Sequence, residues 1–241
     1  IARARDDAED LAAFFGEPDG RRHFSEASID AKALTDPRAE QVDGVFKELA
    51  DDARAGRLKA GDTVVVTIES HLFKPGEAAL VVGTDPQPPG TAWQGASAGG
   101  IAENLEETAS QGCLTILLVD ALHAGASPAA RGAFREWVRD LSRRGGVVLT
   151  ATKQEPSERL ADHGAFTAAV LGSTSISGGA GGRAGSPTTL YDFKDRVIRL
   201  VSENTARRQF AGFYPPETFS GWPKVRIFDP QPTPGGDLVR R

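Results

Sequence analysis

A continuous run of apolar residues from Cys113 to Val119 most constrains what this chain can fold into. The run is rich in Ile, Leu and Val, and it is much shorter than the roughly 20 residues that a helix needs to cross a bilayer. Strands buried on both faces have this composition, because helices cover both sides of a parallel sheet. We therefore expect residues 113–119 to form a central strand of an α/β sheet.

Further apolar segments alternate with helical patterns along the chain. Buried strands are expected at 63–68 and 146–151, a shorter strand at 79–84, and a weak one at 23–34. Helical patterns are found at 2–15, after residue 37, around Ile101 and Leu105, from Phe134 to Leu141, at 158–171 and from Leu190 to Val201. Thr35-Asp36-Pro37 is expected to cap the second of these helices. This alternation predicts a three-layer α/β sandwich, with a mostly parallel central sheet and helices on both faces.

The length of 241 residues predicts one domain, spanning 1–241. Residues 211–241 are rich in Pro and Gly and are expected to form a tail, with Val225 to Phe228 as a candidate edge strand. The Gly-rich segment Ser177–Ser186 lacks the preceding strand and the Lys-Ser/Thr ending of a phosphate-binding loop, so it is interpreted as a flexible linker.

Composition excludes several classes of function. The net charge of −5 gives no reason to expect nucleic acid as a partner, and no apolar run is long enough to span a membrane. The single cysteine, Cys113, excludes an internal disulfide and a multi-cysteine metal site. We expect no metal and no cofactor, and a reducing, cytoplasmic compartment fits the cysteine content.

Polar residues follow two of the expected strands. The central strand leads into Asp120-Ala121-Leu122-His123, and the strand at 63–68 leads into Glu69-Ser70-His71-Leu72. Ligands and catalytic groups of open α/β sheets lie at the carboxyl ends of the strands. The two segments are therefore the first candidates for a functional site.

Both segments resemble those of caspase-like (clan CD, C14-type) cysteine proteases. There the central strand leads into Asp-Ala-Cys-His-Ser-Gly, and the preceding strand into Ser-Gly-His-Gly, which supplies the catalytic histidine. Here His71 falls at the histidine position, flanked by Ser70 and Leu72 in place of glycines, and Leu122 stands at the position of the cysteine. The other matching positions of the cysteine loop are Asp120, Ala121, His123 and Gly125.

Weaker matches extend the resemblance from about residue 2 to about residue 210, in the family's order. Asp6 to Leu11 resembles the first helix of the family, and Leu34 to Ala39 resembles the start of the next. His163-Gly164-Ala165-Phe166-Thr167 resembles its His-Gly-x-Phe-Thr pattern, and Gln209 lies near a recurrent Gln. We expect His123 and His163 to have structural roles.

The resemblance implies the site of a cysteine protease without its nucleophile. Such an enzyme needs a thiolate to attack the carbonyl and a histidine to move the proton, and Leu122 has no atom that can attack. Loss of a nucleophile costs on the order of 10⁶ in rate. Cys113 is expected to be buried and structural, at the opposite end of its strand. Ser70 and His71 are neighbours on a strand and point to opposite faces, which disfavours them as a replacement dyad.

Two acids are implicated by the Arg- and Lys-specific relatives within this resemblance. Asp120 matches the acid that precedes the cysteine by two residues and helps to bind a basic side chain, and Asp85 matches a second, assisting acid. A guanidinium between two carboxylates forms strong charge-assisted hydrogen bonds. The alternative is that Asp120 caps the following turn and Asp85 is an ordinary turn residue.

Three hypotheses for the function follow. The first is a caspase-like pseudoprotease, an interaction or regulatory module that binds a basic peptide or protein segment within a larger polypeptide or assembly. The second is an Arg/Lys-directed, metacaspase-like endopeptidase that is inactive only in this form, with Leu122 in place of the nucleophile. The third is a structural α/β domain that packs against a neighbour.

The resemblance also predicts a gap in the sheet. Relatives have a central apolar strand before the first helix, and this sequence starts in the helix. We expect that strand to come from an upstream segment or from another chain, or its place to be taken by a rearranged segment, because unpaired strand edges are costly.

Overall fold

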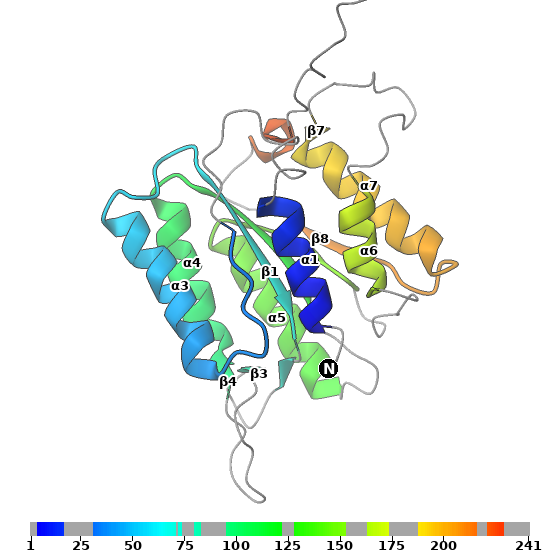
Figure 1. The fold of residues 1–241 in the computed structure, drawn as a ribbon, viewed down its shortest axis with the longest axis horizontal. Coiled ribbons are helices and arrows are strands. Elements are labelled where there is room, and N and C mark those ends of the chain that lie inside the picture. Colours follow the sequence, from blue (N-terminus) through cyan, green and yellow to red (C-terminus); the bar gives the residue numbers. More distant parts are fainter. Residues whose placement is uncertain are drawn as a thin grey trace, which may run out of the picture.

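The computed structural model describes residues 4–16, 31–70, 72–73, 80–82, 95–121, 128–152, 163–173, 188–215 and 221–228 (Figure 1). Its main sheet has the order β1-β5-β6-β8. The bounds of these strands are β1 Thr63–Glu69, β5 Leu114–Asp120, β6 Gly146–Thr150 and β8 Gly212–Tyr214. β1, β5 and β6 are parallel, and β8 is antiparallel to β6. The predicted mostly parallel sheet is confirmed.

The central strand β5 is buried along its whole length, as its composition predicts. Its side chains alternate between two hydrophobic cores, as the two-residue period of a strand requires. Leu117 and Val119 belong to one core, and Ile116 and Leu118 belong to the other. Helices must therefore cover both faces of the sheet.

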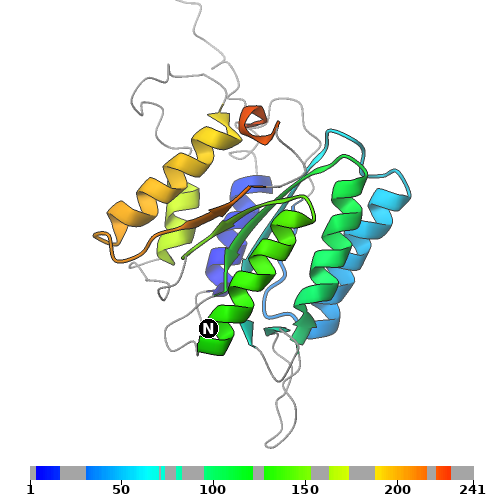
Figure 2. The same cartoon turned by 180° about the vertical axis from the view of Figure 1, so that it is seen from behind.

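The six helices of the described residues form the two outer layers (Figures 1 and 2). The layer on the side of Leu117 contains α3 (Ala39–Arg54), α4 (Ala98–Ser110) and α5 (Pro128–Arg143). The layer on the side of Leu118 contains α1 (Ala4–Gly16), α6 (Ala165–Gly172) and α7 (Leu190–Asn204). The fold is a three-layer α/β sandwich, as predicted.

Helix α5 packs on the sheet through the stripe that the sequence indicates. Phe134, Trp137, Val138 and Leu141 are all buried. The indole Nε1 of Trp137 donates a 3.0 Å hydrogen bond to the carbonyl oxygen of Ala98, the first residue of α4. This bond fixes the start of α4 against α5, because a buried indole N–H requires an acceptor.

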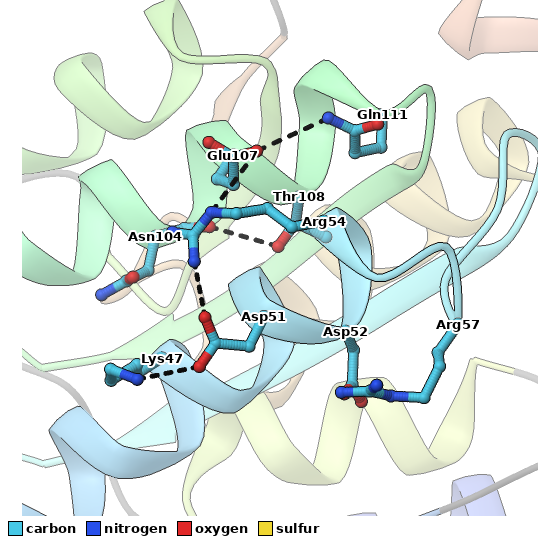
Figure 3. Close-up of polar contacts among 9 residues, drawn as sticks. All are labelled: Lys47, Asp51, Asp52, Arg54, Arg57, Asn104, Glu107, Thr108 and Gln111. Atoms are coloured by element: carbon cyan, nitrogen blue, oxygen red, sulfur yellow. Dashed lines mark hydrogen bonds and ion pairs between the residues drawn. The ribbon is translucent and has the colours of Figure 1, made fainter.

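Helices α3 and α4 are also connected by charged side chains (Figure 3). The guanidinium of Arg54 lies 2.5 Å from Asp51 Oδ1 and 3.8 Å from Glu107 Oε1 on α4, and Lys47 lies 2.8 Å from Asp51 Oδ2. Such exposed pairs contribute little to stability, because solvent screens their charges. The buried side chains of α3, among them Phe46, therefore supply most of the stabilisation of this layer.

Two small sheets accompany the main one. β2 (Leu72–Phe73), β3 (Leu80–Val82) and β4 (Gly95–Ser97) form an antiparallel sheet. β7 (Thr188–Thr189) pairs with β9 (Arg226–Phe228), which follows the 3₁₀ helix η1 (Trp222–Lys224). The strands expected at 79–84 and 225–228 are confirmed at Leu80–Val82 and at Arg226–Phe228.

Three local predictions need correction. The residues 211–241 are not wholly a tail, because β8 is the fourth strand of the main sheet; three residues are too few for a periodic pattern. Thr35-Asp36-Pro37 does not cap α3, whose N-cap is Arg38, with its backbone N–H donating to Gln41 Oε1 at 2.9 Å. Of the weak strand at 23–34, residues 31–34 are described and form no strand.

The outer edge of β1 has no strand beside it among the described residues, where β5 is its hydrogen-bonded neighbour. Val65 and Val66 of this strand are only partly buried. Residues 31–38 run as an extended segment between α1 and α3 (Figure 1) without entering the ladder. Within the described residues β1 is therefore an edge strand, and the expectation of a missing central strand stays a prediction.

None of the described helices combines the length and the apolar character that crossing a membrane requires.

Candidate functional site

The carboxyl ends of β1 and β5 lie side by side. Glu69 is the register partner of Asp120, and the backbone N–H of Ser70 donates a 3.1 Å hydrogen bond to the carbonyl oxygen of Asp120. The two segments that were predicted to carry the site therefore leave the sheet at the same edge. His71, Leu122, His123 and Asp85 themselves lie outside the described residues.

Asp120 is 4 % exposed and is the last residue of the central strand. Its neighbour Glu69 has a buried Oε1 atom that no hydrogen-bond donor reaches within the described ranges. Burial raises the pKa of Glu69 well above its ordinary value, and the negative charges of Asp120 and Asp7 raise it further. Glu69 is therefore more readily protonated than an ordinary glutamate side chain.

A third acid, Asp7, reaches this edge from helix α1. It is 5 % exposed, although it carries a carboxylate. Its Oδ1 lies 2.8 Å from Nδ1 of His163, and its Oδ2 accepts a 3.2 Å hydrogen bond from the backbone N–H of Gly164. Buried carboxylates need such partners, and these two come from the segment that begins α6.

Gly164 brings Asp7 and Asp120 into one local environment. A Cβ atom on this glycine would lie 3.4 Å from Asp7 Oδ2 and 3.6 Å from Asp120 Oδ2. The two carboxylate oxygens thus face the same small space beside the Gly164 backbone. Asp7, Glu69 and Asp120, from α1, β1 and β5, form what we call the carboxylate cluster.

His163 connects the two helices that border the carboxylate cluster. Besides the contact with Asp7, its Nε2 lies 3.7 Å from Oδ2 of Asp10 on α1. The imidazole therefore holds the amino end of α6 against α1, which agrees with the structural role expected for it.

Two other sequence predictions have clear outcomes. Cys113 is buried, its Sγ lies 3.3 Å from the carbonyl oxygen of Lys59, and it immediately precedes the amino end of β5. The predicted burial of this cysteine near the start of its strand is confirmed. Gln209 is fully buried, and its Nε2 donates a 2.6 Å hydrogen bond to the carbonyl oxygen of Ala151, directly after β6.

Reasoning from the sequence missed Asp7 and Glu69 as site residues. The signal for Asp7 was present in the resemblance of Asp6 to Leu11 to the family's first helix, and in the pattern His163-Gly164 that Asp7 contacts. Glu69 was visible as the last residue of an apolar strand. Neither of these sequence segments indicates that Asp7 and Glu69 lie close to Asp120. Their convergence depends on how α1 packs against the sheet.

The cluster can accept hydrogen bonds from a cation. Glu69 and Asp120 lie at the carboxyl ends of parallel strands, where bound groups of α/β proteins usually lie, and Asp7 joins them from α1. Within the described residues no three His, Cys, Asp or Glu side chains have the arrangement of a metal site.

Comparison of the chain with protein-family models and with curated proteins finds no match.

Proposed function

We propose that this chain is a non-catalytic binding module of caspase-like type, which holds a basic side chain of a peptide or protein segment at the carboxylate cluster. The observation that carries the proposal is the convergence of Asp7 and Asp120 on the space beside Gly164. Asp120 was predicted for this role from the sequence. Asp7 is the second acid that the described residues offer, whereas Asp85 lies outside them.

The chemistry of the cluster supports a basic ligand. A guanidinium or ammonium group can donate to carboxylate oxygens of two residues at once, and charge-assisted hydrogen bonds of this kind are about twice as strong as neutral ones. Repulsion among the three acids is a cost in the unbound protein, because the charges of Asp120 and Asp7 already raise the pKa of Glu69. A bound cation offsets that repulsion.

Binding should be coupled to loss of a proton. A cation beside Glu69 favours its ionised form, so the pKa of this carboxyl group falls in the complex. The complex then holds fewer protons than the free protein, and affinity should rise as pH increases through the range in which Glu69 ionises.

The absence of a nucleophile supports binding without cleavage. Leu122, at the cysteine position of the resembling proteases, cannot attack a carbonyl group. The ends of β1 and β5, which precede His71 and Leu122 in the sequence, lie side by side, which is compatible with the proposal.

The test is a titration of the protein with a labelled peptide that contains one arginine, read by fluorescence anisotropy. The matched peptide contains citrulline, which keeps the shape of arginine without its charge. The proposal expects the arginine peptide to bind and to stay intact, and the citrulline peptide to bind at least about tenfold more weakly, which corresponds to 1.4 kcal/mol. Equal affinities for both peptides would refute the basic site.

Variants of single acids distinguish binding at the carboxylate cluster from a general effect of the protein's negative charge. Asp120→Asn should weaken binding of the arginine peptide, whereas Asp195→Asn, an exposed acid paired with Lys194 on α7, should not. Leu122→Cys tests the link to the protease class, because restored cleavage after arginine would show that the remaining machinery is intact. Cleavage by the unaltered chain, abolished by His71→Ala, would contradict the non-catalytic proposal.

A further inference from the structure

Helix α5 carries a row of arginines on its exposed side. Arg131, Arg135, Arg139 and Arg143 follow one another at four-residue intervals, and all are exposed. Residues at this spacing are neighbours on a helix surface, and adjacent like charges destabilise the helix slightly. We call Arg135, Arg139 and Arg143 the arginine stripe, with Arg131 one turn before it.

The charges of this stripe are largely uncompensated within the described residues. No ion pair there involves Arg131, Arg135 or Arg139, and Arg143 lies 3.4 Å from Asp140 Oδ1. Asp140 is shared with Arg144, whose Nε lies 2.9 Å from its other oxygen. The remaining acid of α5, Glu136, is exposed and takes part in no described ion pair. A basic surface of this kind is unexpected on a chain whose net charge is −5.

A pocket of about 300 Å³ lies between the stripe and the end of β8. It is lined by Arg139, Ser142, Arg143, Tyr214 and Pro215. The hydroxyl of Ser142 donates to the carbonyl oxygen of Pro215, which holds this part of α5 against the residue that follows β8. The wall that carries the two arginines is therefore anchored to the sheet.

Tyr214 adds a neutral donor to this pocket. It packs on the same core as α5, and burial raises the pKa of its hydroxyl above the ordinary value, with Arg139 and Arg135 opposing the shift. The hydroxyl therefore stays protonated near neutral pH and can donate a hydrogen bond to an anion. Two guanidinium groups and one phenol at a pocket are suited to carboxylate or phosphate oxygens.

The spacing of the arginines in the stripe favours an anionic partner whose charges are about the same distance apart. One arginine per four helical residues gives a rise of about 6 Å. Alternate residues of an extended peptide lie on one side of the chain, about 6.6 Å apart. An extended segment with an acidic residue at every second position thus presents its carboxylates to successive arginines. We propose that α5 and the end of β8 form a docking surface for such an acidic segment.

This surface is independent of the carboxylate cluster and does not rest on its function. The negative charge of the whole chain opposes binding of any polyanion. Affinity for an acidic peptide must therefore come from a local surface, and it should fall as salt screens exposed charges.

The experiment compares two labelled peptides of equal composition, one with alternating Glu and Ser over eight residues and one with four Glu followed by four Ser. Binding to the full chain is measured by anisotropy at low and at physiological salt. The proposal expects the alternating peptide to bind at least about threefold more tightly than the block peptide. The double variant Arg135→Gln/Arg139→Gln should weaken binding of the alternating peptide by at least about fivefold, because it removes two of the charges that pair with the peptide carboxylates.

The matched control is Arg57→Gln/Arg199→Gln, which removes the same charge from exposed positions outside α5. It should leave the affinity within about twofold of the unaltered chain. Far-ultraviolet circular dichroism and thermal melts establish that both variants fold. Equal weakening in both double variants, equal affinity for both peptides, or tighter binding of a single-stranded oligonucleotide of the same charge would each overturn the proposal.

Discussion

Glu69 and Asp120 are register partners at the carboxyl ends of two adjacent parallel strands, β1 and β5. Like charges directly opposite each other destabilise a sheet. Here burial, together with Asp120 and Asp7, raises the pKa of Glu69 well above its ordinary value. Ionisation of both carboxyl groups is therefore unfavourable at this edge of the sheet, where α/β proteins bind their ligands.

Replacing Glu69 by Gln should stabilise the protein near neutral pH. A carboxyl group whose pKa is higher in the folded than in the unfolded state does not disfavour folding at low pH, where it is protonated in both states. As pH rises above the ordinary Glu value, the unfolded chain loses this proton first, and folding becomes less favourable. We expect a gain in the free energy of unfolding at pH 7.5, and a much smaller gain at pH 4. Urea denaturation at both pH values measures this difference, and an equal gain at both would contradict the assignment.

Replacing Gly164 by Ala should abolish binding of a basic side chain with little loss of stability. The added methyl carbon would make ordinary contacts, 3.4 and 3.6 Å, with oxygens of Asp7 and Asp120, and would stand between these oxygens and a proposed guanidinium ligand. The φ of −58° suits alanine, although Ala is a poorer N-cap than Gly, at a cost of up to about 1 kcal/mol. Titration with the arginine peptide and a thermal melt give the two readouts. A variant that folds and binds normally would place the ligand elsewhere.

Replacing Gln209 by Leu should destabilise the fold. The change removes the donor to the carbonyl oxygen of Ala151 and leaves that acceptor buried, at a cost of about 1–3 kcal/mol. Gln111→Leu, at the exposed end of α4, is the control and should change the free energy of unfolding by less than about 0.5 kcal/mol. Chemical denaturation compares the two, and equal effects would show that the buried hydrogen bond contributes nothing.

The outer edge of β1 should exchange its amide hydrogens faster than β5 does. β5 has a strand on each side, whereas β1 has one described neighbour. In β1, the amides that point away from β5 lack a ladder partner, so we expect protection to alternate along Thr63–Glu69. Residue-resolved hydrogen exchange by NMR tests this. Uniform protection along β1, matching that of β5, would mean that another segment pairs with this edge.

The layered fold could be predicted because its strongest signals are local. The run that became β5 and the stripe of Phe134, Trp137, Val138 and Leu141 on α5 have the expected periods and are buried. The strand β8 could not be recognised, because Gly212–Tyr214 depends on β6 for its hydrogen bonds rather than on a pattern of its own. Short antiparallel strands of this kind are specified by tertiary contacts.

The candidate site was only partly predictable for the same reason. Asp120 could be predicted, because the end of a buried central strand is a position with a known tendency to carry ligands. Asp7 lies more than a hundred residues away in sequence and reaches Asp120 through the contact of α1 with His163 and Gly164. Such a convergence is a property of helix packing.

The binding site is tested most directly by calorimetric titration of the arginine peptide over a series of pH values from the ordinary Glu value upward, in buffers of different ionisation enthalpy. The peptide should bind intact, release protons, and bind more tightly as pH rises, and Glu69→Gln should remove the proton release. Absence of binding by the unaltered chain, or binding that takes up protons, would contradict the proposed site.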